Sequence, residues 1–186
     1  MGFIGRNSAY SIQYNKTASE RFWLEINATS NPSKPIIVIM KNPSATCINM
    51  AHGTCTISGY SQLKRCRIDR TTGKVYRRLK KNFDKIIILN LFSIYSTATA
   101  TINSAPGNIT TNDTEITNIL NKYFDSPVIC AWGDNSQISP ITYRLRVQAI
   151  RHIINHRFLL QYDKKTQLFI PYVFGMSYPK HGLTWT

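Results

Sequence analysis

The feature that most constrains this fold is a run of five apolar residues, Ile36–Met40, which no polar residue interrupts. A short run of this kind, rich in β-branched side chains, predicts a strand buried on both faces, as in the interior of a parallel sheet. The run ends at Lys41–Ser44, where a proline breaks the strand. Because ligands of open α/β sheets bind just beyond the carboxyl ends of the strands, Asn42 and Ser44 are candidate site residues. The alternative is an ordinary Asn-Pro-Ser turn.

Predicted strands and helices alternate along the rest of the chain. Further strands are predicted at residues 85–92, 126–133 and 168–175, the last at a sheet edge because it contains Pro171. Residues 21–27 indicate an edge strand that leads into the core. Helices are predicted at about 72–81, at 111–124 with Thr111 or Asn112 as its cap, and at about 140–156. This order predicts an α/β fold of three layers, in which helices flank a central, mainly parallel four-stranded sheet.

The length of 186 residues fits a single domain, with residues 1–34 as an N-terminal edge segment and residues 35–185 as the core. Hydrophobic residues make up 42% and charged residues 17%, which is typical of a globular chain and not of a disordered one. The sequence contains neither an apolar run of membrane-spanning length nor an N-terminal signal peptide. We therefore expect a cytoplasmic protein that does not enter a membrane, and a monomer.

Positive charge dominates the composition. The chain has 23 Lys and Arg against 9 Asp and Glu, a net charge of +14, which favours a polyanionic partner such as nucleic acid. The charge is densest at residues 61–85, where clustered cations displace the counterions of a phosphate backbone. The predicted DNA-contacting cations of this stretch are Arg65, Arg67, Arg70, Lys74, Arg77, Arg78, Lys80 and Lys81. The alternative is a basic helix face that only contacts water.

The four cysteines predict thiols and not disulfide bridges. Cys47, His52, Cys55 and Cys66 lie close together in the sequence, but their spacing matches none of the zinc patterns. We therefore expect neither a metal nor a cofactor.

Four short blocks resemble the uracil-DNA glycosylase superfamily, over roughly residues 35–185. The blocks are IVIMKNPSAT, IIILNLF, VICAWGDNS and YPKHGLTW. The sequence is more closely similar to a group of uncharacterised bacterial and phage proteins that shares that fold. The long Ser/Thr-rich stretch and the pair Asn112-Asp113 resemble this uncharacterised group in particular.

The resemblance implies a cofactor-free enzyme of base excision and DNA repair, which binds DNA and extrudes a base into a pocket. Asn42 matches the residue that activates the attacking water, with Ser44 beside it, and Asn90 matches the residue that reads the base edge. His181 matches the histidine that stabilises the departing base. Phe92, Tyr60 and Tyr95 are candidates for the stacking aromatic, and Leu183 or Trp185 for the wedge that fills the vacated stack.

Departures from the pattern leave two alternatives open. Met40 and Lys41 stand where active branches have a glycine, and an amide activates water less well than a carboxylate does. One alternative is therefore a catalytically inactive module of the same fold that only binds nucleic acid. The other is a hydrolase of free nucleotides or nucleosides. The alternative role of Asn42 and Asn90 themselves is only to cap the turns that follow their strands.

Overall fold

The computed structural model describes residues 14–15, 18–19, 22–29, 32–43, 47–48, 66–67, 70–94, 107–134, 138–175 and 178–185. For the two-residue strands and for Leu183 the description is limited to the backbone.

Six strands form the main sheet, in the order β10-β9-β8-β4-β7-β3. Their bounds are β3 Trp23–Asn27, β4 Pro35–Met40, β7 Lys85–Asn90, β8 Val128–Cys130, β9 Leu159–Asp163 and β10 Leu168–Pro171. The four inner strands run parallel, whereas the edge strands β10 and β3 pair antiparallel with their neighbours. The fold is therefore α/β with a mixed sheet, and the prediction of a mainly parallel sheet of four strands is wrong.

The missed strand is β9, which occupies the parallel position that we predicted for residues 168–175. Its five residues include Gln161 and Asp163, and only Leu159 and Tyr162 are buried. It therefore lacks the continuous apolar run by which the other inner strands are recognised. Strand β10 ends at Pro171 and lies at the sheet edge, as the proline predicts.

The inner strands are apolar throughout because both faces of the sheet are covered. Ile36, Val38 and Met40 belong to one core cluster, whereas Ile37 and Ile39 belong to another on the opposite face. Each of these five residues is at most 4% exposed.

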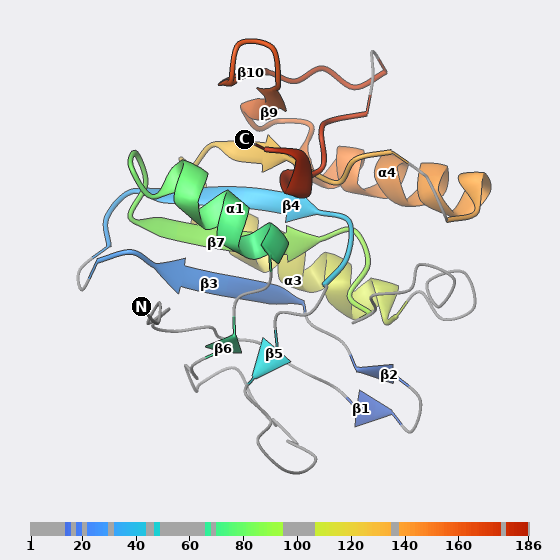
Figure 1. The fold of residues 1–186 in the computed structure, drawn as a ribbon. Helices are drawn as coiled ribbons and strands as arrows, with labels where there is room; N and C mark the ends of the chain where they lie inside the picture. Colours follow the sequence, from blue (N-terminus) through green and yellow to red (C-terminus); the bar gives the residue numbers. More distant parts are fainter. Residues whose placement is uncertain are drawn as a thin grey trace.

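In the described part of the chain, three helices complete the three layers: α1 (Arg70–Leu79), α3 (Ile109–Lys122) and α4 (Pro140–Ile154). Helix α1 and the 3-10 turn η1 (Gly182–Thr184) cover one face, and α3 and α4 cover the other (Figure 1). All three helices lie within a few residues of their predicted ranges. The predicted cap of α3 is wrong, because Asn108 caps it through a side-chain oxygen that accepts from the backbone N–H of Thr111 at 3.0 Å.

The connections of β4 and β8 lead to opposite sides of the sheet. From β4 the chain passes through α1 to β7 on one side, and from β8 it passes through α4 to β9 on the other. Strands β4 and β8 thus flank a topological switch point, and open α/β sheets bind ligands beyond the carboxyl ends of the strands at such a point.

Two short pairs lie outside the main sheet: β1 (Tyr14–Asn15) with β2 (Ala18–Ser19), and β5 (Cys47–Ile48) with β6 (Cys66–Arg67). In the described part of the chain, no helix has the length and apolar character that crossing a bilayer requires.

Candidate functional site at the carboxyl edge of the sheet

Asn90 is the last residue of β7 and has no exposed surface. Side chains alternate along a strand, so its amide points to the α1 face, as Ile86 and Ile88 do. Neither the nitrogen nor the oxygen of this amide has a hydrogen-bond partner among the described residues. Leaving such a group unpaired costs about 1–3 kcal/mol, so a ligand that offers one acceptor and one donor would recover this energy.

Asn42 ends the neighbouring strand at the same edge. Met40 lies opposite Asn90 in the parallel register, and pairing continues beyond it, because the N–H of Phe92 donates to the carbonyl of Lys41 at 3.0 Å. Asn42 follows directly and is half-buried, and its amide nitrogen donates to the carbonyl of Pro43 at 2.9 Å.

The close approach of the chain at two glycines, Gly133 and Gly182, places His181 at this edge. Gly133 follows β8 with φ of +75°, and a Cβ atom placed on it would lie 3.0 Å from the Cβ of His181. A Cβ on Gly182 would lie 2.9 Å from Cγ2 of Val75 in α1 and 3.7 Å from Cε of Met40. The segment 181–182 therefore packs against the ends of β8 and β4 and against α1. A methyl group at either glycine would displace it.

Three predicted residues from distant parts of the sequence, Asn42, Asn90 and His181, thus lie at one edge of the sheet. They come from the ends of β4 and β7 and from the segment against β8, on both sides of Met40. The arrangement of the strands explains why these three predicted residues lie at the same edge.

Lys41 is an unexpected charged group at this edge. It is 8% exposed, its ammonium lies 4.0 Å from Oδ1 of Asp134, and it sits 5.8 Å from the centroid of the Tyr143 ring. Burial lowers the pKa of Lys41, an effect that Asp134 partly opposes. The hydroxyl of Tyr143 donates to the carbonyl of Gly133, so Tyr143 joins the start of α4 to the end of β8.

The predicted basic cluster lies mainly at the other end of α1. Because α1 returns the chain to the start of β7, its last turn lies near the amino edge of the sheet. A pocket of about 320 Å³ is lined there by Lys74, Arg77, Arg78, Lys81 and Trp185, with no Asp or Glu among the described residues that line it. Arg70 is exposed at the start of α1, and Lys80 lies 5.4 Å from the centroid of the Tyr76 ring.

The structure places two predicted DNA or base contacts in the core. Trp185 is 1% exposed, with ring centroids 5.6 Å from Tyr162 and 5.2 Å from Phe169, so its ring is not available as a wedge. Phe92 is also 1% exposed and packs in the core on the α3 and α4 face, away from the Asn90 amide. This packing does not favour the stacking role of Phe92, which stays a prediction.

Several predictions fall outside the described part of the chain. Ser44, Arg65, Tyr60, Tyr95, His52 and Cys55 are not described, and Cys47, Cys66, Arg67 and Leu183 are described only by their backbone. In the described part, no three His, Cys, Asp or Glu side chains form a group that would hold a metal ion. Cys130 is a buried free thiol, and burial raises its pKa well above the ordinary value, which makes it a poor nucleophile.

Comparison with protein families gives one match. A family of proteins of unknown function, DUF1643, matches residues 58–168, which is more than half of the chain. The chain belongs to the DUF1643 family. Searches of curated proteins and of solved structures found no match.

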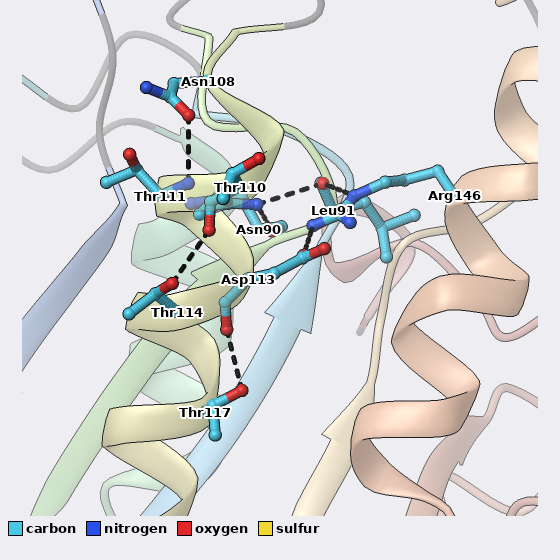
Figure 2. Close-up of polar contacts among 10 residues, drawn as sticks. Asn90, Leu91, Asn108, Thr110, Thr111, Asp113, Thr114, Thr117 and Arg146 are labelled. Atoms are coloured by element: carbon cyan, nitrogen blue, oxygen red, sulfur yellow. Dashed lines mark hydrogen bonds and ion pairs between the residues drawn. The ribbon is translucent and has the colours of Figure 1, made fainter.

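The part of the chain that matches DUF1643 contains a buried polar network that sequence analysis missed. Arg146 is 4% exposed, donates from Nε to the carbonyl of Leu91, and forms an ion pair with Asp113 at 2.5 Å. The amide nitrogen of Asn112 donates to the carbonyls of Asn90 and Leu91 at 3.0 and 3.2 Å. Figure 2 shows how α3 and α4 meet across the carboxyl end of β7.

This network fixes the backbone of the residue that carries the unpaired amide. The pair Asn112-Asp113 was noted in the sequence, but its role depends on Arg146, which lies on a different helix. One signal was present: Arg146 lies three residues after Tyr143 and four before Ile150, on the buried stripe of α4. An arginine in such a stripe indicates a buried partner. The DUF1643 match includes Asn90 and this network, whereas Asn42 and His181 lie outside it.

Proposed function

We propose that this DUF1643 protein binds DNA and takes an extruded base into the carboxyl edge of its sheet, as uracil-DNA glycosylases do. The proposed reaction is hydrolysis of the N-glycosidic bond of uracil or a related damaged base. The observation that carries the proposal is the amide of Asn90, which is fully buried and has no partner among the described residues. A pyrimidine edge, with a carbonyl acceptor beside an N–H donor, satisfies both atoms of this amide.

The neighbouring residues fit the steps of such a reaction. Asn42 orients the attacking water from the end of β4. His181, held against Gly133, stabilises the negative charge that develops on the departing base. Neither step requires a metal or a cofactor. A base within a duplex is inaccessible to these groups, so the nucleotide has to leave the stack first.

The pocket beside α1 supports DNA as the polyanion. Four cations line it, three on α1 and Lys81 in the turn just after it, and no carboxylate among the described residues neutralises them there. Cations at this spacing repel one another, and a phosphate backbone relieves this repulsion and releases its own counterions.

A second function, DNA binding without catalysis, is favoured by the surroundings of Asn42. Lys41 occupies the position where active glycosylases resembled by this chain have a small residue, and its buried side chain fills space beside Asp134. The amide nitrogen of Asn42 also donates to Pro43, and an amide has no basic site to take a proton from water.

The test is incubation with single- and double-stranded oligonucleotides that carry one uracil, followed by alkali and analysis of strand breaks. We expect breaks with the native protein, and their loss in Asn90→Ala and His181→Ala. Asn118→Ala and His152→Ala are matched controls, because both side chains are exposed on helices away from this edge.

Salt-sensitive DNA binding without strand breaks would overturn catalysis and support the inactive module. If the protein neither cleaves nor binds DNA, the proposed function is wrong, and hydrolysis of free nucleotides becomes the next function to measure.

A further inference from the structure

A second pocket, of about 410 Å³, lies between the middle of α4 and the chain that follows β10. Helix α4 contributes Arg144 and Arg151, and the following chain contributes Tyr172, Phe174 and Tyr178. No Asp or Glu belongs to its described lining. The pocket therefore combines aromatic rings with guanidinium groups.

Two flat groups are positioned in this pocket by packing. The Tyr178 ring is 44% exposed and is held edge-on against buried Tyr143, with ring centroids 5.4 Å apart. The guanidinium of Arg151 lies 5.5 Å from the centroid of Phe174, and that ring is stacked on buried Trp132 at 6.2 Å. A ring and a guanidinium that are already held in place lose little conformational entropy when a flat ligand stacks on them.

The backbone turns at Gly175, which lines this pocket. This residue has φ of +95°, a conformation that side-chain-bearing residues rarely adopt, and a Cβ placed on it would meet no atom within 4 Å. The chain thus turns at the pocket without filling it.

We propose that this pocket binds an unstacked nucleobase of single-stranded DNA, next to the base held at the carboxyl edge. Unstacked bases are bound by aromatic rings and arginine planes, with cations on the phosphates. In this pocket Tyr178 and Arg151 stack on the base, and the exposed Arg144 contacts the adjoining phosphate. A duplex offers no unstacked base face, so the pocket selects single-stranded DNA.

The path of the C-terminal segment, residues 178–185, connects this pocket with the site described above. Tyr178 contacts Tyr143 on the α4 face, His181 lies against Gly133 at the end of β8, and Trp185 lines the basic pocket beside α1. One segment therefore crosses the carboxyl edge and borders all three places. A strand that follows it has one base at the aromatic pocket and another at Asn90. The inference rests on the proposed function in taking DNA as the ligand and in placing a second base at Asn90.

The test is fluorescence anisotropy with a labelled oligothymidine and with a duplex of the same length. We expect Tyr178→Ala to weaken binding of the single strand by about 5- to 150-fold, which corresponds to the typical loss for one stacked base, and to leave duplex binding unchanged. Tyr178→Phe keeps the ring and the affinity. Phe158→Ala removes an exposed ring outside the pocket, 65% exposed, and leaves both affinities unchanged.

A second readout identifies the contact directly. A strand that carries a halogenated uracil is cross-linked by light, and the modified peptide is found by mass spectrometry. We expect Tyr178 to carry the cross-link. The proposal that this pocket binds a base would be overturned if Tyr178→Ala left the single-strand affinity unchanged, or if it lowered the affinities for single strand and duplex equally.

The outcome for the proposed glycosylase is read separately, from uracil release. Tyr178-dependent binding of single strands without uracil release supports this pocket and overturns catalysis. Uracil release together with single-strand binding that does not depend on Tyr178 supports catalysis and overturns this pocket.

Discussion

A stability measurement distinguishes a structural role of Asn90 from a role in binding a ligand. Its amide is buried and has no hydrogen-bond partner among the described residues, so in a purely structural protein it lowers stability. We predict that Asn90→Leu, which keeps the side-chain size, raises the free energy of unfolding by about 1–3 kcal/mol. In a chain of this length this corresponds to roughly 2–4 °C in Tm for each kcal/mol. Thermal unfolding followed by circular dichroism measures it, and the same variant should lose all uracil release.

The matched control is Asn112→Leu. Asn112 is equally buried, but its amide nitrogen donates to the carbonyls of Asn90 and Leu91. Its replacement should lower stability by about 1–3 kcal/mol, because two buried carbonyls lose a donor. If Asn90→Leu lowers Tm as Asn112→Leu does, Asn90 has a structural role and the argument for a base site fails.

Lys41 predicts a pH dependence of stability. Burial lowers its pKa below the ordinary value of 10.5. Between the folded pKa and 10.5 the unfolded chain binds a proton that the folded chain does not, so this group makes stability rise with pH in that window. Below the window the lysine is charged in both states, and burying the charge opposes folding.

We therefore predict that Lys41→Met raises Tm at pH 7, and that the gain over the native protein shrinks as the pH approaches 10.5. Differential scanning calorimetry at several pH values measures it. Lys34→Met, at an exposed position, should change stability by no more than about 0.5 kcal/mol. A gain that stays constant with pH would show that Lys41 titrates normally.

At the scale of elements, the strands that could be predicted are those that are recognised by a single property, their apolar composition. Strands β4 and β7 are continuous apolar runs, and their ends placed Asn42 and Asn90 correctly at the sheet edge. Strand β9 was missed because its stability comes from pairing with β8 and β10 on either side and not from its own composition. Likewise, the network of Arg146 depends on two helices that meet across β7, which no local pattern reveals.

The junction of α3 and α4 gives the prediction at this scale. Arg146→Met removes the donor to Leu91 and the partner of Asp113, so the free energy of unfolding should fall by about 3 kcal/mol. Chemical denaturation with urea measures it. Arg144→Met, on the same helix but exposed, should change stability by no more than about 0.5 kcal/mol. Equal effects of the two substitutions would mean that the junction contributes nothing.

At the scale of the whole molecule, the net charge of +14 attracts any polyanion, so affinity alone does not locate a binding surface. The slope of affinity against salt does locate it, because each phosphate contact that is lost reduces the slope by about 0.9 for a duplex and 0.7 for a single strand. Arg77→Glu with Lys81→Glu removes two cations that line the basic pocket, and should flatten the slope by about 1.4 for a single strand and about 1.8 for a duplex.

The control for charge is Lys34→Glu with Lys122→Glu, which changes the net charge equally but at exposed positions that do not line this pocket. If the protein attracts DNA only through its total charge, both pairs of substitutions change the salt slope by the same amount. A molecule that holds the backbone beside α1 responds to the first pair alone, because long-range attraction between exposed charges is largely screened beyond about 10 Å at moderate salt. Titrations at several salt concentrations therefore separate a general attraction from a defined DNA path along α1, and identical slopes for the two pairs would exclude the path.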